Sequence, residues 1–471
     1  MFIQKFINRK EEINFLEREY KKDKPFFLVI YGRRRAGKTE LIRQFIEGKK
    51  AIYFLATQEV EKENMASLSE ELAGFFGDSS IKINPFSAFR QVMEYLKDKV
   101  KSIKSRTVII IDEFPYLVDA NKAVPSILQK YWDMHFKSSN LGLILCGSSI
   151  GAMESEVLGS KSPLYGRRTG QWKVEPLSFE DAIKLFPSSD FGSQIQAYSA
   201  IGGIPLYLLE MDPSLSILEN IKSNVARKGA FLYEEVPFIL KEELREPRVY
   251  FSLLKEISSG KTKLNDIKNA MGVERTLLGR YIETLETLGL IEKETAITAK
   301  PKSKNTLYVL KDNFFRFWFR FVFPHKKELE RGEYKNFLAK LELDFNHFIG
   351  VSFEQICRDF LIKNCTPFQL SRIGRQWGKV PGASKEKNQY EIDICGINEA
   401  SKEIIFGESK WQDNVDAKKV LAGLKEKAGY VDWHRKERKE HYAIFAKSFK
   451  GGFEEKNVQL FDLQQLAKLY R

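Results

Sequence analysis

The sequence has few cysteines and no long apolar run. Its 471 residues include Cys146, Cys357, Cys365 and Cys395, which form no CxxC pair and have no histidine at a zinc-site interval. This spacing argues against disulfides and structural zinc, and favours reduced thiols. No segment reaches the roughly 18 apolar residues that a membrane-spanning helix needs, and the start, MFIQKFINRKEE, lacks an apolar signal core. We therefore expect a cytoplasmic protein with no membrane partner.

Acidic residues are fewer than basic residues, 63 against 76. The formal net charge is +13 and the pI is about 9.2, which favours a polyanionic partner such as nucleic acid, although a lysine-rich protein without such a partner has the same charge. The hydrophobic share of 43% and the aromatic share of 13% are enough to fill several cores and exclude a disordered chain. The length predicts about three domains.

A phosphate-binding loop is predicted near the start of the chain. Residues 26–31, FFLVIY, form an unbroken apolar run typical of a strand buried in a parallel sheet. GRRRAGKT follows directly, matches GxxxxGK[ST], and leads into the helix-like TELIRQFIEG. The predicted ATP ligands are Gly32, Arg33, Arg34, Arg35, Ala36, Gly37, Lys38, Thr39 and Glu40.

Each residue type in this loop has a chemical role. Gly32 and Gly37 let the backbone turn its N–H groups towards phosphate. Lys38 is expected to reach the β and γ phosphates, and Thr39 to ligate Mg²⁺. ATP and Mg²⁺ are the expected cofactors.

Two further strands carry polar residues to their carboxyl ends, where an open parallel sheet binds its ligands. TVIIIDEF, residues 107–114, ends in Asp112, expected to hold Mg²⁺ through water, and Glu113, expected to orient or deprotonate the attacking water. LGLILCGSS, residues 141–149, ends in Ser148, whose hydroxyl is expected to sense the γ-phosphate.

An arginine pair follows the third strand in SPLYGRR, residues 162–168. Arg167 is the expected catalytic arginine that approaches the phosphates, with Arg168 as the alternative. Whether Arg167 acts within its own subunit is left open.

The middle of the chain has helical patterns. Residues 176–245 are expected to form a helical lid. Residues 246–311 are expected to form a winged helix-turn-helix, with three helices and two strands around a lysine-bearing turn. It would bind DNA through Arg275, Arg280 and the wing lysines Lys300, Lys302 and Lys304. The alternative is an intramolecular spacer that packs on the ATPase, because Glu283 and Glu286 share the exposed face and would repel phosphate. Residues 312–345 contain the run FFRFWFRFVF, which is expected to be a buried connector.

The last region, residues 346–471, presents a set of carboxylates. A helix bearing Glu354 precedes two strand candidates, YEIDICGI with Asp393 and EIIFGESKW with Glu408 and Lys410. Residues two apart on a strand face the same side, so Glu408 and Lys410 project together, and Asp393 can join them from the neighbouring strand.

Such carboxylates can ligate a divalent ion. We expect Asp393 and Glu408 to hold a second Mg²⁺ or Mn²⁺ that polarises a scissile phosphate, with Glu354, Asp393, Glu408 and Lys410 as the catalytic group. The alternatives are two solvated charges on a strand or a domain that only docks a partner. Nearby lysines and arginines either follow a nucleic-acid backbone or form a solvated face: Lys418, Lys419, Arg435 and Arg438.

The order of the motifs carries a family resemblance. GRRRAGKT, IIIDEFPYL, LCGSSIGAME, SPLYGRRTG and IGGIPLYL resemble the archaeal-type P-loop ATPase family, close to the AAA+ and STAND groups, and FINRKEEINFL resembles its opening segment, which contacts the nucleotide base. The resemblance implies ATP binding and slow, switch-like hydrolysis. The acidic pattern resembles the PD-(D/E)xK restriction-endonuclease-like superfamily, with ID in place of PD, and also the domain of unknown function that accompanies these ATPases, which GRQWGK fits.

The expected fold class is therefore α/β: a P-loop NTPase parallel sheet over residues 1–175, a helical lid, a winged helix and a restriction-endonuclease-like domain. The expected function is an ATP-hydrolysing switch coupled to a nucleic-acid-binding domain that cleaves its substrate with a metal ion, DNA being the favoured partner. The alternative is an ATP-gated DNA-binding regulator or scaffold that forms a homo-oligomer or docks a protein through its last domain.

Overall fold

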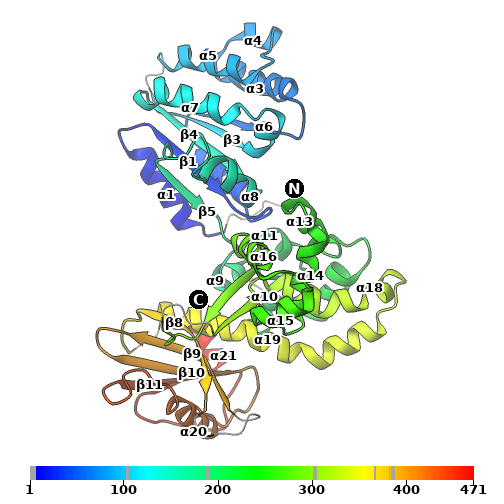
Figure 1. Cartoon of the computed structure of the whole chain (residues 1–471), viewed down its shortest axis with the longest axis vertical. Helices are drawn as coiled ribbons and strands as arrows, with labels where there is room; N and C mark the ends of the chain where they lie inside the picture. The colour runs from blue at the N-terminus through cyan, green and yellow to red at the C-terminus, as the bar shows by residue number, and fades with distance from the viewer. Residues whose placement is uncertain are drawn as a thin grey trace. The chain divides into compact units, whose positions relative to one another are not determined.

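The computed structural model describes residues 7–101, 105–186, 190–300, 305–364, 367–380, 382 and 388–470. Lys302, Lys304 and Cys365 lie outside these residues. The chain divides into two compact units (Figure 1). The first contains residues 1–177 and 204–206, and the second contains residues 178–203 and 207–471.

The first unit is built on a five-stranded sheet with the order β2-β3-β4-β1-β5. Its strands are β1 (Phe26–Tyr31), β2 (Ala51–Leu55), β3 (Thr107–Asp112), β4 (Leu141–Gly147) and β5 (Gly170–Lys173), and every pairing is parallel. The strands β1, β3 and β4 are buried at every position, as their unbroken apolar runs predict. The expected parallel α/β sheet is confirmed.

Helices flank this sheet in Figure 1. They are α1 (Lys10–Lys21), α2 (Lys38–Ile46), α3 (Glu61–Phe76), α4 (Ser79–Ile83), α5 (Phe89–Val100), α6 (Phe114–Ala120), α7 (Val124–Met134) and α8 (Ile150–Met153). Two of them begin at the carboxyl ends of central strands, α2 after β1 and α6 after β3. The phosphate loop and the acidic pair are thereby brought to one edge of the sheet.

The next helices are α9 (Phe179–Ala182), α10 (Phe191–Ile201), α11 (Pro205–Leu209), α12 (Ile217–Asn220) and α13 (Glu235–Glu243). All belong to the second unit except the first two residues of α11, which belong to the first. Three helices follow, α14 (Pro247–Ser258), α15 (Leu264–Met271) and α16 (Arg275–Thr287), and then an antiparallel hairpin of β6 (Ile291–Thr295) and β7 (Thr306–Leu310). These elements lie where the sequence predicts three helices and two strands.

The aromatic run forms α17 (Asn313–Phe317), a π-helical turn (Trp318–Val322) and the start of α18 (Phe323–Glu330). Its rings are buried, and the fully buried Trp318 donates its indole N–H to the carbonyl of Tyr233 at 3.0 Å. Phe317 contacts Phe345 and Phe348 of α19 (Lys335–Asn364), and Phe251 of α14 contacts Trp318. The prediction of a buried connector is confirmed.

The predicted boundary at residue 346 is wrong because it falls inside α19, one continuous helix of 30 residues. KNFLAKLELDFNHF contains no glycine or proline that would stop the helix before Phe348. The connector and the last region are therefore one body. Among the described residues, no helix is long and apolar enough to cross a membrane.

The C-terminal sheet has five strands in the order β12-β11-β10-β9-β8. They are β8 (Arg372–Lys379), β9 (Gln389–Asn398), β10 (Glu403–Lys410), β11 (Lys439–Ala446) and β12 (Val458–Phe461), with the helices α20 (Ala417–Ala428) and α21 (Leu463–Leu469). β8, β9 and β10 pair antiparallel, whereas β11 and β12 add in parallel to β10. The predicted hairpin of β9 and β10 is confirmed.

The segment after β6 is docked on this sheet. The amide of Ile297 donates to the carbonyl of Arg375 on β8 at 3.0 Å, and the Thr298 hydroxyl donates to the side-chain oxygen of Gln376, also at 3.0 Å. Ile297 also packs against the C-terminal core. The expected alternative was a spacer that packs on the ATPase, whereas these contacts are with the C-terminal sheet.

Candidate nucleotide site and C-terminal carboxylate site

The backbone of the phosphate loop requires its glycines. Gly32 has φ 148°, and a Cβ there would lie 2.3 Å from the carbonyl oxygen of Val174, which no side chain can tolerate. Arg35 and Gly37, with φ 66° and 89°, are left-handed and turn the loop into the start of α2. The loop therefore has the reversed backbone that presents N–H groups to an anion.

Lys38 bridges the loop. Its side chain is buried at 5% exposure, and its ammonium donates to the carbonyls of Gly32 and Arg33, each at 2.9 Å. An ammonium held at this place can exchange those carbonyls for phosphate oxygens without moving far.

Thr39 and Asp112 meet as the sequence predicts. The Thr39 hydroxyl donates to Asp112 Oδ2 at 2.9 Å, and Asp112 is 1% exposed. A hydroxyl and a carboxylate side by side are hard oxygen donors, so this pair fits Mg²⁺.

Tyr53 of β2 was missed by the sequence reasoning. Its hydroxyl donates to the same Oδ2 of Asp112 at 2.7 Å, and burial, followed by the hydrogen bond to Asp112, raises the pKa of Tyr53. No motif marks a tyrosine on a neighbouring strand, so only the register of β2 against β3 reveals it.

Glu113 lies against Ser148. Glu113 Oε2 accepts hydrogen bonds from the amide of Ser148 at 3.0 Å and from its hydroxyl at 2.9 Å. The backbone of Glu113 is left-handed, with φ 51°, and directs the carboxylate towards the end of β4. Ser148, expected to sense phosphate, is here the partner of the expected base.

Arg167 lies at the other edge of the sheet. Its guanidinium pairs with Asp133 at 3.2 Å, and the amide of Thr169 donates to the carbonyl of Phe27 near the start of β1. Gly32 follows the other end of β1, and at roughly 3.3 Å per residue it lies about 16 Å along the strand from Phe27. The expectation that Arg167 reaches the phosphates is thus not met within one chain. Arg168 donates instead to the carbonyl of Leu158 at 3.4 Å.

Arg9 is a second residue whose role was missed. Its guanidinium donates to the carbonyl of Ala36 in the phosphate loop at 2.7 Å and to the carbonyl of Glu175 at 2.8 Å. It thereby ties the opening segment to the loop. The signal was present in FINRKEEINFL, which the resemblance assigned to contact with the base.

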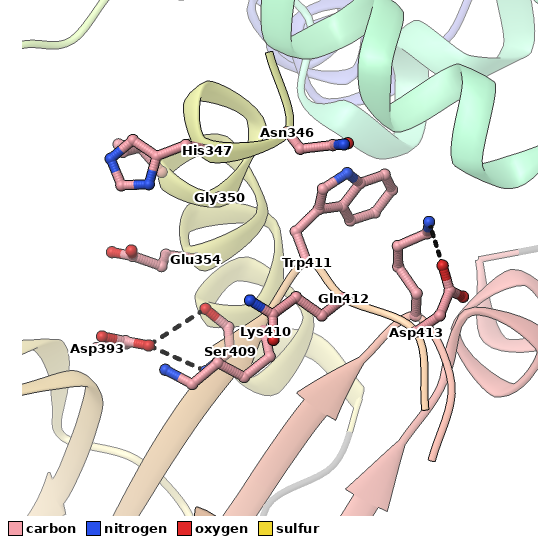
Figure 2. A pocket seen from close by; sticks show the side chains of 12 residues that line it. Asn346, His347, Gly350, Glu354, Asp393, Ser409, Lys410, Trp411, Gln412 and Asp413 are labelled. Atoms are coloured by element: carbon pink, nitrogen blue, oxygen red, sulfur yellow. Dashed lines mark hydrogen bonds and ion pairs between the residues drawn. The ribbon is translucent and has the colours of Figure 1, made fainter. Parts of the chain in front are cut away.

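The C-terminal carboxylates come from three elements. Glu354 lies on α19, and the register of β9 against β10 ends at the pair of Gly407 and Ile394, so Asp393 and Glu408 are the next residues on the two strands. Figure 2 shows Glu354, Asp393 and Lys410 lining a cavity of about 740 Å³. The Asp393 carboxylate accepts the amide of Ser409 at 3.0 Å. Glu354 and Asp393 thus line one cavity, whereas Glu408 does not line it.

Two ammonium groups neutralise Glu408. Lys410 lies 2.7 Å and Lys427 3.0 Å from Glu408 Oε1, and the Glu408 side chain is 7% exposed. Lys427 belongs to α20, the helix whose lysines were expected either to follow a nucleic-acid backbone or to form a solvated face. Lys418, Lys419 and Arg435 are indeed exposed.

The interpretation of Arg438 was wrong. Its side chain is 1% exposed and donates to the carbonyls of Ala428, Val431 and Trp433 at 2.6–3.0 Å. It satisfies carbonyls at and beyond the end of α20, so it can neither follow a nucleic-acid backbone nor form a solvated face.

Burial perturbs the acids that face the cavity. It raises the pKa of Glu354 to about 7, with the charge of Asp393 adding to the rise, while Arg375 and Arg358, each 3.9 Å away, oppose it. Burial and then the charge of Glu408 raise the pKa of Asp393, against the Ser409 N–H.

A preformed metal site was expected from these acids. In the described part of the chain, no three acidic, histidine or cysteine side chains are grouped closely enough to hold an ion. The donors are oxygens, as Mg²⁺ or Mn²⁺ requires, but the oxygens of Glu408 are bound to lysines. Metal binding at Asp393 and Glu408 would require those ammonium groups to be exchanged.

The comparisons with known proteins agree with the sheet and the loop. A family model described as an ATPase domain predominantly from Archaea matches residues 6–211, and another, for archaeal and bacterial proteins of unknown function, matches residues 318–420. The Walker-type ATPase of Pyrococcus abyssi has the same fold, with a TM-score of 0.52, 21% identity, and coverage of 67% of this chain and 96% of that chain. The fold and the phosphate loop define a P-loop ATPase domain in the first part of the chain.

The particular family follows from a full-length relative. An uncharacterized protein of Methanocaldococcus jannaschii is 34% identical over 473 residues, which cover 98% of this chain and 100% of the relative. The chain belongs to the family of this protein. A second uncharacterized protein of that organism is 35% identical over 95 residues, or 20% of this chain and 89% of that protein.

Proposed function

We propose that the protein is a Mg²⁺-dependent ATP hydrolase that works as a switch, close to the AAA+ and STAND groups. The observation that carries the proposal is the contact of Glu113 with Ser148. In this arrangement the base is held by the residue placed to sense the γ-phosphate. When Ser148 turns to the phosphate, Glu113 is released to the attacking water.

The other residues divide the remaining work. Lys38 and the loop amides bind the phosphates, and Glu113 accepts the proton of the attacking water. Thr39 and Asp112 would hold Mg²⁺, which supplies positive charge to the phosphate oxygens when bound. A second copy of the chain would be needed to bring Arg167 to the phosphates, so the switch would act in a homo-oligomer.

Two substitutions test hydrolysis. Lys38→Ala should abolish ATP binding and turnover, because the phosphate loop loses its ammonium. Glu113→Gln should keep ATP bound and lower the turnover rate by about 10²–10⁴, the usual contribution of a general base. Steady-state phosphate release and equilibrium ATP binding measure the two effects.

Glu47→Gln is the matched control, because Glu47 is an exposed residue that follows α2. It should leave both readouts unchanged. Wild-type turnover in Lys38→Ala and in Glu113→Gln alike would show that this site does not hydrolyse ATP.

We propose as a second function that the C-terminal region cleaves nucleic acid, with DNA as the favoured substrate. Support comes from Asp393 and Glu408, the next residues after the last pair of the β9–β10 register, and from Glu354, which lines the same cavity as Asp393. The order of a helix, three antiparallel strands, a helix and a parallel strand is similar to the restriction-endonuclease-like core. Asp393 and Glu408 would hold Mg²⁺ or Mn²⁺, which polarises a phosphodiester when bound, and Lys410 would position the water.

Cleavage is tested with Asp393→Ala. Nicking of labelled single-stranded, duplex and branched DNA and of RNA, with Mn²⁺ or Mg²⁺, should fall at least about 100-fold because a carboxylate that binds the metal is lost. Glu399→Gln, an exposed turn residue, is the control. If the wild-type protein cuts none of these substrates with or without ATP, the domain is a binding platform.

The alternative of an ATP-gated DNA-binding regulator rests on α16. Arg275 and Arg280 are exposed there, whereas the segment after β6 is docked on β8. Salt-dependent DNA binding lost on substitution of both arginines, in a protein that does not cleave, would favour it. A cytoplasmic location is proposed from Cys146, Cys357 and Cys395, which are buried free thiols.

A further inference from the structure

A smaller cavity of about 250 Å³ adjoins Glu354 inside the second unit. Helices α14, α17 and α19, the hairpin β6–β7 and strand β8 contribute to its walls. Its volume is below the roughly 300 Å³ at which pockets begin to enclose a drug-sized ligand. Four cations and three acids line it: Lys311, Arg316, Arg358, Arg375, Glu292, Glu294 and Glu354.

Two of the arginines have acidic partners. Arg375 pairs with Glu294 at 2.9 Å and with Glu391, and it lies 3.9 Å from Glu354. Arg358 donates to the side chain of Gln355 at 2.7 Å and also lies 3.9 Å from Glu354. Both guanidinium groups thus have carboxylate neighbours, although the Nε of Arg375 is also buried without a hydrogen-bond partner.

Arg316 is different. One of its terminal nitrogens donates to the hydroxyl of Ser352, and the guanidinium lies 4.9 Å from the ring centroid of Phe348. Its Nε is buried without a hydrogen-bond partner, and no carboxylate of the described residues forms an ion pair with it. Burial lowers the pKa of Arg316 to about 10. A buried N–H of a charged group that lacks an acceptor is costly to leave unpaired.

Nearby acids offset only part of the effect of burial on Arg316: Glu354, Asp312 and Glu292, in that order, raise its pKa. Burial, and then the charge of Glu294, raises the pKa of Glu292, so its ionised form is disfavoured beside Arg316. Glu294 is taken by Arg375. Lys311 adds a further positive charge to the lining, so the cavity carries an excess of positive charge.

We infer that this cavity binds a phosphate group, with Arg316 as its principal ligand. The planar guanidinium has an unpaired Nε–H and lines the cavity, and phosphate oxygens accept such charge-assisted hydrogen bonds well. The size suits orthophosphate or the terminal phosphate of a nucleic-acid strand rather than a whole nucleotide. The inference depends on neither ATP hydrolysis nor cleavage.

The test is titration calorimetry of orthophosphate into the full chain at constant ionic strength and in EDTA. All proteins carry Lys38→Ala, which weakens phosphate binding at the phosphate loop. The parent should bind one phosphate, and Arg316→Gln should weaken it at least about tenfold, as expected for a lost hydrogen bond to a charged group. Arg320→Gln should bind like the parent, because Arg320 is an exposed arginine of the same aromatic run.

No binding by the parent, or equal binding by Arg316→Gln, would overturn the inference. If Arg316→Gln does not fold, Arg316→Lys keeps the charge but loses the Nε–H donor, and an affinity equal to that of the parent would overturn it as well. Oligonucleotides with a 5′-phosphate or a 5′-hydroxyl then identify the source. Tighter binding of the 5′-phosphorylated oligonucleotide that disappears in Arg316→Gln indicates that the ligand is a strand end. Equal binding of the two oligonucleotides by a protein that binds orthophosphate indicates that the ligand is free phosphate.

Discussion

At the scale of single residues, Glu354 shows how burial and charge set the state of a carboxyl group. It lines the two cavities described above, and burial is the first cause that raises its pKa to about 7. An exposed glutamate has a pKa of about 4.3. At a pH between these two pKa values, Glu354 is protonated in the folded protein and ionised in the unfolded chain.

This difference predicts a pH-dependent stability. Because the folded state binds more protons, the free energy of unfolding declines as the pH rises from about 4.5 to about 7. Glu354→Gln removes the cost of the buried charge, so it should stabilise the protein at pH 8 by on the order of 2 kcal/mol and much less at pH 5. Urea unfolding at both pH values measures the effect.

The control for this prediction is Glu399→Gln, which changes an exposed carboxyl group. It should give the same small shift at both pH values. Unfolding free energies of wild type and Glu354→Gln that differ equally at pH 5 and pH 8 would show that Glu354 is ionised in the folded protein throughout.

Tyr53 and Lys427 show which residues sequence reasoning misses at this scale. Each contacts an acid that the sequence singles out, Tyr53 with Asp112 and Lys427 with Glu408. Neither has a motif of its own, because a tyrosine on a strand or a lysine on an amphipathic helix is common. Only the pairing of β2 with β3, and the packing of α20 on β10, bring these two side chains to their acidic partners.

At the scale of elements, the hairpin β6–β7 is joined to the C-terminal sheet by Gln376. This side chain is 3% exposed, accepts from Thr298, and donates to the Tyr390 hydroxyl at 3.1 Å. Apolar packing of Ile297 accompanies these bonds. The predicted wing is thus held inside the second unit by a buried polar contact.

Removal of this contact should release the segment. Gln376→Ala leaves the Thr298 amide without its acceptor, which should cost about 1–3 kcal/mol. Hydrogen exchange at residues 296–298 should accelerate by about tenfold or more, while Gln389→Ala, an exposed glutamine on β9, should not change it. Unchanged exchange in Gln376→Ala would mean that backbone pairing and Ile297 alone hold the segment.

The strands of both sheets were largely predictable at this scale. FFLVIY, TVIIID and LGLILC are short apolar runs typical of a strand buried on both faces, and YEIDI alternates as a half-buried strand does. The end of a helix was harder to place. Without a glycine or proline before Phe348, α19 continues through a boundary that composition alone suggests.

At the scale of the whole molecule, two units replace the five predicted segments. The lid helices, the three-helix region, the aromatic connector and the C-terminal sheet form one unit because α10 packs on α17 and α19, and the aromatic rings fill the space between α14 and α19. Such long-range packing has no periodicity in the sequence. The nucleotide site belongs to the first unit, and both cavities described above belong to the second.

The sequence by itself determined the phosphate loop, the acidic pair after β3 and the order of carboxylates in the last region, because each depends on short-range pattern and on strand ends that share one edge of a sheet. The tertiary structure decided that Arg167 lies away from the loop, that Ser148 holds Glu113 and that two lysines neutralise Glu408. These are contacts between residues 2 to 35 positions apart along the chain. These contacts depend on strand register and on burial. A buried polar or charged group is costly unless it is paired, so its partner is whichever polar group the packing places beside it.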